Sequence, residues 1–344
     1  MHQFWDKQPV PHNEAHKVGE IEEERKSYTE PLKLPGDFVW SEFSFEDIHA
    51  FVKEHYVSDD RFKLEYDFST MRWASEASGH EHICIALAET GKLVGYISSV
   101  PSKVRVVEDV LNMVDINFLC VHPSYRNNRL APILISEAKR RANTNNIWQA
   151  VYTAETKIPT PITKSHYWHR FLDVKYLIKS GFYQTNRPRE KYYELQGRSM
   201  FRKMTSKDVP KVTKILKTYF EKFKIAPVIN EKWVRYWILP IHAYVNDQSD
   251  DFISFYEIPY ERTDGSYTVK QVYSYYMVGD VYNDAFILAR NQGYHVFNTL
   301  DIGQTDESIE KFKFMKGTGH VYYYLFNWGL REDIKKEDVQ LKLP

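Results

Sequence analysis

The chain has 344 residues and carries 46 lysines and arginines against 46 aspartates and glutamates, so its formal net charge is zero. This balance excludes bulk electrostatic binding to nucleic acid or to an acidic membrane surface. Hydrophobic residues make up 43% of the chain, enough for a large core, and two cysteines, Cys84 and Cys120, argue against a disulfide scaffold and for a reducing compartment. No segment reaches the roughly 20 apolar residues of a membrane span, and no signal-peptide pattern opens the chain, so we expect a cytoplasmic protein.

Residues 1–37 lack hydrophobic periodicity and carry a charged run at 20–26, a pattern typical of a disordered arm. Phe4 and Trp5 depart from this pattern, because an arm that stays in solvent has little use for two aromatic side chains. We therefore expect an N-terminal arm, residues 1–37, that packs on the rest of the protein.

The first half of the chain after the arm combines helices and strands. A helix is predicted over 43–56, with Ser44 as its N-cap and the acidic Glu46 and Asp47 in its first turn. Strands are predicted at 83–89, 92–107 and 114–122, followed by a helix at 131–143 and a strand at 148–155.

The second half repeats this order. A helix is predicted over 204–223, capped by Thr205 or Ser206 and with Pro210 near its start. Strands at 252–259 and 269–279, a helix near 283–291 and a strand at 295–302 follow. The repeated order predicts two α/β units, residues 38–200 and 201–344, that meet near 197–203 without a flexible linker.

Residues 115–141 carry the strongest functional signal. An apolar strand leads into a short loop with Arg126 and Arg129, and a helix follows with Pro132 in its first turn. Backbone N–H groups at a helix N-terminus, flanked by arginines, suit a pyrophosphate, and the strand before them can meet a thioester. This arrangement indicates a CoA-dependent acyltransferase.

Several ordered motifs then resemble a known family. The spacing of Arg126, Arg129 and Ala131 resembles the phosphate-binding turn of the GNAT acyltransferase superfamily, and NFLCVH followed by RxxRLAP resembles the signature of the N-myristoyltransferase family. Further blocks that resemble this family, in the same order, are HQFWDKQPVP, HYVSDD, QAVYTA, YWHRFL, FISFYEIP, VFNTLDI and YYYLFNW.

The resemblance implies a fold and an activity. The implied fold is α/β (an α+β mixed sheet), in which two fused GNAT-like units are related by pseudo-twofold symmetry around a large saddle-shaped mixed sheet. The implied activity is transfer of a myristoyl group from myristoyl-CoA, a co-substrate rather than a prosthetic group, to the N-terminal glycine of peptides and proteins. The first unit would bind myristoyl-CoA and the second the peptide, in a monomer that binds no nucleic acid.

The resemblance also implies a set of residues for the acyl-CoA, with the N-terminal block packed over it. One departure from the family is Asn128, where a lysine is usual. The implied acyl-CoA residues are His2, Gln3, Phe4, Trp5, Phe118, Leu119, Cys120, Val121, Arg126, Asn127, Asn128, Arg129, Leu130, Ala131 and Pro132.

Two catalytic demands follow from thioester aminolysis: donors for the developing oxyanion, and a base for the ammonium. The family pattern assigns the first to the backbone N–H groups of Phe118 and Leu119, which a bulge in the strand would free, with the Asn117 amide nearby. The base would be the C-terminal carboxylate of Pro344, with the Thr153 hydroxyl as a partner of the amine. In the tail, Val339, Leu341 and Leu343 alternate as in a buried strand, and Lys342 falls on the opposite face.

The peptide residues implied by the same blocks are Tyr56, Val57, Asp59, Asp60, Leu64, Tyr66, Tyr167, His169, Ser274 and Asn298. Two departures thin the family's acidic cluster: Arg61 follows Asp60, and Thr318 replaces the acid of a Gly-Asp-Gly turn. We therefore expect a weaker preference for basic residues in the peptide.

Other readings of the chain are open to test. Cys120 could act as a nucleophile with His122 as its base, and the protein could instead be an N-acetyltransferase with a short acyl donor or a non-catalytic protein that binds acyl-CoA or N-terminal glycines. His80, His82 and Cys84 alternate along a possible strand, but a fourth ligand is missing and the spacing is not that of a common zinc site, so we expect no metal.

Overall fold

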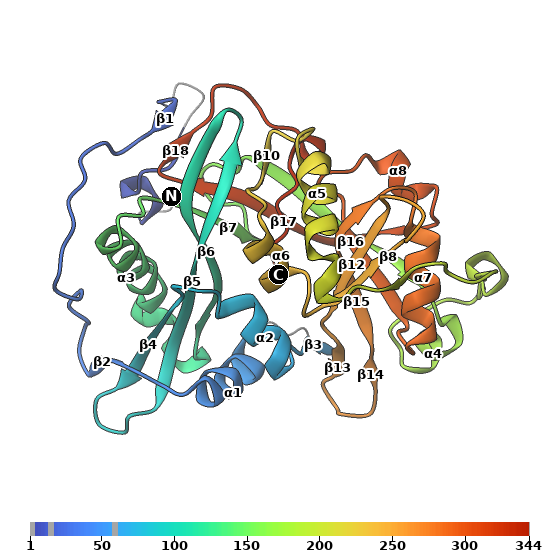
Figure 1. The fold of residues 1–344 in the computed structure, drawn as a ribbon. Helices are drawn as coiled ribbons and strands as arrows, with labels where there is room; N and C mark the ends of the chain where they lie inside the picture. Colours follow the sequence, from blue (N-terminus) through green and yellow to red (C-terminus); the bar gives the residue numbers. More distant parts are fainter. Residues whose placement is uncertain (1–3, 13–16, 57–60, 344) are drawn as a thin grey trace.

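The structure of the protein is a computed structural model, and it describes residues 4–12, 17–56 and 61–343. The protein is built around one large mixed sheet (Figure 1). The sheet has 13 strands in the order β2-β4-β5-β6-β7-β17-β8-β16-β15-β12-β11-β9, with β10 added beside β5. Only β6 with β7 and β15 with β16 are parallel neighbours among these described pairs. Each parallel pair is joined through a helix, α3 in the first unit and α7 in the second, as a crossover connection requires.

Most elements of the first half lie on the left of Figure 1, whereas α4 and β8 lie on the right among elements of the second half. Its helices are α1 (Phe45–His55), α2 (Phe68–Ser75), α3 (Leu130–Thr144) and α4 (Val174–Lys179). Its strands are β2 (Phe38–Ser41), β3 (Phe62–Leu64), β4 (Glu81–Leu87), β5 (Leu93–Val106), β6 (Asp109–Val121), β7 (Gln149–Ala154) and β8 (Thr163–Phe171).

Most elements of the second half lie on the right, whereas β18 lies on the left beside β1. Its helices are α5 (Val209–Phe220), α6 (Glu231–Trp237), α7 (Tyr282–Asn291) and α8 (Asp306–Glu310). Its strands are β9 (Arg202–Lys203), β10 (Ile225–Pro227), β11 (His242–Val245), β12 (Phe252–Glu257), β13 (Tyr260–Arg262), β14 (Thr268–Val269), β15 (Gln271–Val278), β16 (Val296–Leu300), β17 (Met315–Phe326) and β18 (Trp328–Gly329).

The two sides of the sheet are arranged alike about its centre, because each strand on one side has a counterpart at the same position on the other side. From the centre outward, β7, β6, β5 and β4 on one side correspond to β16, β15, β12 and β11 on the other. The two central strands are exchanged: β17 of the second half pairs with β7, and β8 of the first half pairs with β16. The predicted mixed α/β fold with a large sheet is confirmed, and its halves are tied by strands that cross over.

Local signals in the sequence explain where the helices begin. Ser44 accepts a hydrogen bond from the Asp47 backbone N–H at the start of α1, as predicted. Thr205 and Asp208 form a capping box before α5, and Pro210 occupies the first turn of α5, where a missing N–H costs nothing. The single helix predicted over 204–223 is in fact a short 3-10 turn, Ser206–Asp208, followed by α5.

The N-terminal arm is ordered where the structure describes it. Its strand β1 (Gly19–Glu20) pairs with β18, and the Asn327 backbone N–H donates to the Pro9 carbonyl. Farther along, the Leu32 backbone N–H donates to the buried Glu137 carboxylate on α3, which also holds the guanidinium of Arg140. These partners explain why a segment without periodicity packs instead of staying in solvent.

A search of the described residues finds no helix whose length and apolarity would let it cross a bilayer.

Candidate active site

Strand β6 carries a bulge at the predicted catalytic residues. Its partner strand β5 pairs Tyr96 with Cys120 and Ser98 with Asn117, so that two residues of β6, Phe118 and Leu119, lie opposite one residue of β5. Phe118 has a φ of 53°, a left-handed conformation that a bulky L residue rarely adopts. The bulge that the family resemblance required is therefore present, and it takes both residues out of the regular ladder.

Aromatic packing holds the bulge in this conformation. The Phe118 side chain is 2% exposed and its ring lies 5.0 Å from that of Tyr66 and 5.7 Å from that of Tyr56. Both tyrosines come from the segment around β3 that the resemblance assigned to the peptide, and Leu64 on β3 packs against the same core. Burial raises the pKa of Tyr56 to about 12, so its hydroxyl stays protonated.

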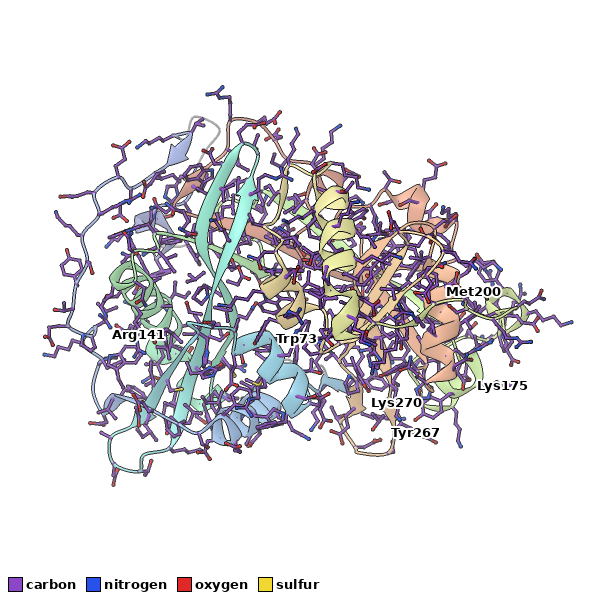
Figure 2. All side chains as sticks on the ribbon, viewed as in Figure 1. Trp73, Arg141, Lys175, Met200, Tyr267 and Lys270 are labelled. Carbon is purple, nitrogen blue, oxygen red and sulfur yellow. The ribbon has the colours of Figure 1, made fainter. Side chains whose placement is uncertain are left out.

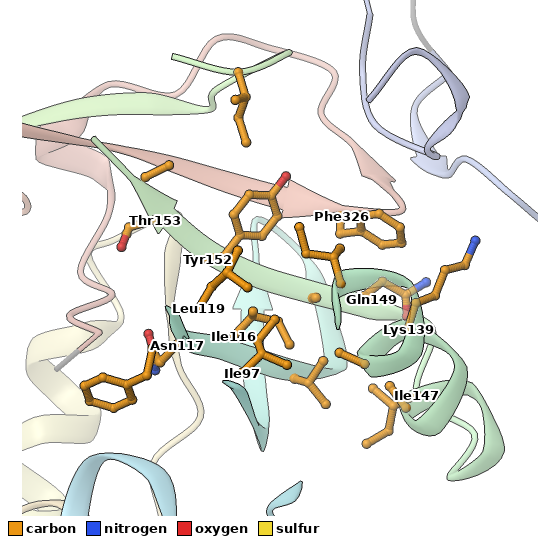
Figure 3. A pocket seen from close by; sticks show the side chains of 18 of the residues that line it. Ile97, Ile116, Asn117, Leu119, Lys139, Ile147, Gln149, Tyr152, Thr153 and Phe326 are labelled. Carbon is orange, nitrogen blue, oxygen red and sulfur yellow. The ribbon is translucent and has the colours of Figure 1, made fainter. Parts of the chain in front are cut away.

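An apolar cavity of ≈ 260 Å³ begins at this bulge. Figure 3 shows Asn117 and Thr153 at one end of the cavity and Ile147 and Lys139 at the other. Its walls come from β5, β6, α3, β7, β17 and the N-terminal arm. The apolar side chains that line it include Ile97, Val114, Ile116, Leu119, Ile135, Ala138, Ile147, Trp148, Tyr152 and Phe326. An apolar cavity of this kind suits an alkyl chain.

The N-terminal arm closes one wall of the cavity. The Trp5 ring stacks on that of Tyr152 with 5.8 Å between ring centroids, and Tyr152 stacks in turn on Tyr324. Phe4 packs edge-on against Trp5 at 5.2 Å. Two of the four arm residues assigned to the acyl-CoA thus lie beside the cavity, while His2 and Gln3 lie outside the described residues.

The loop after β6 ends at an uncapped helix N-terminus. Residues Pro123–Asn128 form a 3-10 turn, Arg129 adopts a left-handed φ of 58°, and α3 begins at Leu130 with no side chain bonded to its first N–H groups. Asn127, Asn128 and Arg129 are exposed around this helix end. Free N–H groups and the helix dipole make it a site for phosphate groups.

Other residues of this loop have structural partners. The Arg126 guanidinium donates to the Val121 carbonyl at 3.2 Å and to the His55 carbonyl at 3.3 Å, so it anchors the loop to α1. Leu130 is fully buried against the sheet, and Ala131 and Pro132 are half-buried behind it. Asn127, Asn128 and Arg129 therefore present the loop's exposed polar groups.

Cys120 lies beside the bulge but is a poor nucleophile. The side chain is 3% exposed, and burial raises the pKa of its thiol to about 12. His122 does not serve it as a base: its Nδ1 accepts from the Ser124 backbone N–H, and its ring packs on that of His55. The geometry thus favours direct transfer over a cysteine intermediate.

On the peptide side, polar residues form a fixed chain. The His169 Nδ1 lies 2.7 Å from the Asn298 amide oxygen, and the Asn298 amide nitrogen donates to Gln271 at 2.8 Å. Asn298 has no exposed surface, and its amide oxygen orients the His169 ring. Burial lowers the pKa of His169, which keeps its ring neutral, and Tyr167 lies next to Tyr273 with their rings 6.2 Å apart.

Ser274 is occupied by a residue of the C-terminal tail. The Lys342 Nζ donates to the Ser274 Oγ at 2.9 Å, and that oxygen also bonds the Thr299 hydroxyl at 2.7 Å. Lys342 is 6% exposed, and burial lowers its pKa to about 7. The tail is not a strand: after Val339 makes one bridge to Ile225 it continues without regular pairing.

The tail enters the interior as far as the structure describes it. Val339 and Leu341 are buried, and Leu341, Lys342 and Leu343 line a second cavity of ≈ 580 Å³ together with Asp115 of β6. Asp115 lies two residues before Asn117, and burial raises its pKa to about 7. Pro344, the predicted base, is outside the described residues, as are Val57, Asp59 and Asp60 of the peptide loop.

The sequence motifs missed most of the cavity wall. Ile97, Ile135, Ile147, Trp148 and Phe326 come from four separate segments. Phe326 lies inside the block YYYLFNW, but nothing in the local sequence marks these residues as lining one space. Tyr152 lies inside a block that resembles the family, so a signal for it existed. Nothing in the sequence predicted that Lys342 is buried. The alternation of apolar residues in the tail indicated only that its side chain faces away from those of its neighbours.

The crossover from a bulged strand to an uncapped helix, beside a long apolar slot, defines a GNAT-like acyltransferase that uses an acyl-CoA donor. The family model for the N-terminal domain of myristoyl-CoA:protein N-myristoyltransferase matches residues 18–165, and the model for its C-terminal domain matches residues 183–342. The chain therefore belongs to the N-myristoyltransferase family.

Individual relatives agree with this assignment. The chain is 35% identical to glycylpeptide N-tetradecanoyltransferase 1 of Arabidopsis thaliana over 99% of its own length and 89% of the relative's. It is 36% identical to glycylpeptide N-tetradecanoyltransferase 2 of Danio rerio, over 95% of this chain and 74% of that protein. A crystal structure of Saccharomyces cerevisiae N-myristoyltransferase with bound myristoyl-CoA superposes with a TM-score of 0.90 at 29% identity, covering 97% of this chain and 90% of that one.

Proposed function

We propose that this protein transfers the myristoyl group of myristoyl-CoA to the α-amine of an N-terminal glycine. The observation that carries the proposal is the cavity that starts at the Phe118–Leu119 bulge, because it places a long apolar slot next to backbone donors. An acyl chain in the slot would bring its thioester carbonyl to the end at which Asn117 and Thr153 lie. The nucleotide part of CoA would then extend toward Asn127, Asn128, Arg129 and the first turn of α3.

The chemistry needs no covalent enzyme intermediate. The amine attacks the thioester carbonyl, the C–S bond breaks, an amide forms, and the proton lost by nitrogen balances the thiolate that leaves. The N–H groups of Phe118 and Leu119 stabilise the oxyanion, with Asn117 beside them, which is worth on the order of 3 kcal/mol for one such donor. Thr153, on β7 at the same end of the cavity, holds the incoming amine.

The base in this proposal is the carboxylate of Pro344. Support comes from the tail before it, which is buried at Leu341 and Lys342 and lines a cavity shared with Asp115 on the bulged strand. A carboxylate held in a buried place has a raised pKa and an ammonium beside it a lowered one, so proton transfer between them becomes less unfavourable.

The peptide would cross the sheet between the bulge and β8. Tyr56, Leu64, Tyr66 and Tyr167 provide apolar walls, and His169 provides a neutral polar group held by Asn298. Ser274, bonded to Lys342, supports the tail in this arrangement. Val57, Asp59 and Asp60 complete the family's peptide loop.

We assign parts of the chain to these tasks as follows. Residues 1–37 cover the acyl chain through Phe4 and Trp5, residues 38–200 bind the CoA ester, and residues 201–344 bind peptide and carry the terminal carboxylate. We propose that the protein acts as a monomer. Both cysteines are free and buried, which supports a reducing compartment such as the cytoplasm.

A donor and acceptor assay tests the activity. Purified protein with myristoyl-CoA and a peptide that begins with Gly should release CoA and yield the acylated peptide, whereas the same peptide beginning with Ala should not react. Acetyl-CoA should be a poor donor, because a two-carbon chain leaves the apolar slot unfilled. Efficient acetyl transfer would favour the short-chain alternative, and binding of myristoyl-CoA without transfer would favour the non-catalytic one.

The terminal base and the thiol are tested separately. Three residues added after Pro344 should abolish transfer but leave acyl-CoA binding intact, while the same insertion after the exposed Gly265, in the turn between β13 and β14, should have little effect. Full activity of the extended protein would exclude the carboxylate as base. Cys120→Ala should retain transfer, as should the matched variant Cys84→Ala, and complete loss in a folded Cys120→Ala protein would favour the thiol mechanism.

A further inference from the structure

Three side chains with metal-ligand chemistry meet away from the acyl cavity, between the end of α2 and the start of β4. Glu76 lies just past α2, His80 lies in the following turn and His82 lies on β4. One ligand atom from each can be chosen so that all three lie within 4.8 Å of one another. The Glu76 Oε1 is 3.6 Å from the His82 Nε2, and the two histidine rings have centroids 4.7 Å apart.

Each of these side chains is oriented by a second partner that leaves one ligand atom free. The His80 Nδ1 donates to the Ala77 carbonyl at 3.1 Å, and the His82 Nδ1 lies 2.9 Å from the Tyr96 hydroxyl. The Arg72 guanidinium holds the Glu76 Oε2. Metal-binding histidines nearly always have their second ring nitrogen fixed in this way, because the contact sets the tautomer and the direction of the ring.

The free nitrogen of His82 has no hydrogen-bond partner among the described residues although it is buried. An unsatisfied buried polar atom is unfavourable, so this nitrogen is suited to accept a ligand. The 3.6 Å from this nitrogen to the Glu76 oxygen is too long for a hydrogen bond. It is close to the separation of about 3.4 Å between two ligands of a tetrahedral ion bound at about 2.0–2.1 Å.

We propose that Glu76, His80 and His82 bind a divalent transition-metal ion of the zinc class. Two imidazole nitrogens and one carboxylate oxygen are the donors that Zn²⁺ accepts, and the fourth position would hold water, because the side chains of Glu76 and His82 are 18% and 17% exposed. Cys84, which alternates with the two histidines in sequence, is not a ligand, since it turns into the core.

The ion would fasten α2 to β4 and thereby stiffen a contact between the two halves of the protein. Trp73, on α2, packs against Trp237, Tyr256 and Tyr275 of the second half, with ring centroids 5.4–5.7 Å apart. Figure 2 shows Trp73 where α2 borders the second half. The site takes no part in acyl transfer, so its presence does not depend on the proposed function.

The test is calorimetric titration of the chelator-treated, full-length protein with ZnCl₂, together with Co²⁺ titration followed by visible absorption. We expect one ion per chain, a rise in Tm with added Zn²⁺, and Co²⁺ bands of a four-coordinate site. His80→Ala and Glu76→Gln should each weaken binding at least tenfold. His12→Ala, which removes an exposed histidine from the arm, should leave binding unchanged.

Absence of stoichiometric Zn²⁺ binding would overturn the proposal, and so would binding that His80→Ala and Glu76→Gln leave intact. If His12→Ala weakened Zn²⁺ binding as much as His80→Ala and Glu76→Gln do, the ion would lie elsewhere, and this result would overturn the proposal as well. Glu76→Gln keeps the shape of the side chain, so it tests the proposal even if His80→Ala does not fold.

Discussion

At the scale of single residues, Lys342 is the clearest departure from a stable core. Its side chain is buried beside Ser274 and Tyr276, and it lines the same cavity as Asp115. Burial lowers the pKa of Lys342 to about 7, against the ordinary lysine value of about 10.4. The unfolded chain therefore binds more protons than the folded one between these two values, and stability should rise with pH across that window. Below about pH 7 the buried cation costs its full penalty, on the order of a few kcal/mol.

Lys342→Met should accordingly stabilise the protein, and the gain should shrink as the pH rises from about 6 to about 9. Urea unfolding of both proteins at several pH values measures this difference. Lys335→Met changes an exposed lysine of the same tail and should alter stability by less than about 0.5 kcal/mol. A gain for Lys342→Met that does not depend on pH would show that the lysine carries the same charge in the folded and unfolded chains, so that its pKa is not lowered on folding.

Thr318 is a second residue with a specific consequence. It is exposed between Gly317 and Gly319, in an irregular part of the β8–β17 ladder, where a Cβ on Gly317 would lie 2.4 Å from the His169 Nε2. Only glycine fits at position 317, because any side chain there would collide with His169. The family's acid at the position of Thr318 is absent, so the peptide meets less negative charge here.

Thr318→Asp should therefore raise kcat/KM for peptides with Lys or Arg near the N-terminus relative to peptides with Glu there. An exposed ion pair is worth up to about 1 kcal/mol, so the ratio should change by roughly fivefold at most and should decline with salt. Thr318→Asn, which adds bulk without charge, is the control. A parent protein that already shows a strong basic preference unaffected by salt would contradict the reasoning.

At the scale of elements, the N-terminal arm shows how a segment without hydrophobic periodicity is held against the rest of the protein. Trp5 covers the acyl cavity through its stack on Tyr152, and the arm beyond it is held by β18 and by Glu137 on α3. The arm's contribution to binding should be local to the acyl chain.

Trp5→Ala should weaken binding of a non-hydrolysable myristoyl-CoA analogue by about tenfold, which corresponds to the loss of roughly 1.4 kcal/mol of aromatic contact. Peptide affinity should change little. Trp5→Phe keeps a ring over Tyr152 and should retain most of the affinity. Equal affinity of the alanine variant and the parent, measured by calorimetry, would show that the arm does not cover the acyl chain.

At the scale of the whole molecule, the exchange of β8 and β17 decides how the protein folds. Both neighbours of β8, β16 and β17, belong to the second half, and β17 lies between β7 and β8 of the first half. Neither half can complete its sheet alone, because each would expose long unpaired strand edges. The two units are therefore one cooperative body, whatever their common origin.

Separate expression of residues 1–200 and 201–344 should give two chains without a cooperative thermal transition, and co-expression should restore one transition together with acyl transfer. Circular dichroism melting and size-exclusion chromatography measure the outcome. A half that unfolds cooperatively by itself would show that the exchanged strands are dispensable.

Much of this architecture was readable from local sequence. The apolar strand, the polar loop and the Pro-containing helix of 115–141 were predicted correctly, because short-range periodicity and helix-start signals depend on neighbouring residues alone. The caps at Ser44 and Thr205 were predicted for the same reason. Ordered motifs then indicated the family and, with it, the need for a bulge at Phe118.

What the sequence by itself determined is therefore the set of elements, their order and the chemistry of the donor loop. Only the tertiary structure decided which distant side chains share a space: the slot between Ile97, Trp148 and Phe326, the burial of Lys342 on Ser274, and the meeting of Glu76 with His80 and His82. The physical reason is that these contacts depend on side-chain packing between segments often a hundred or more residues apart. Local sequence patterns predict the secondary structure of each segment and the face that it buries. They do not predict which other segment covers that face.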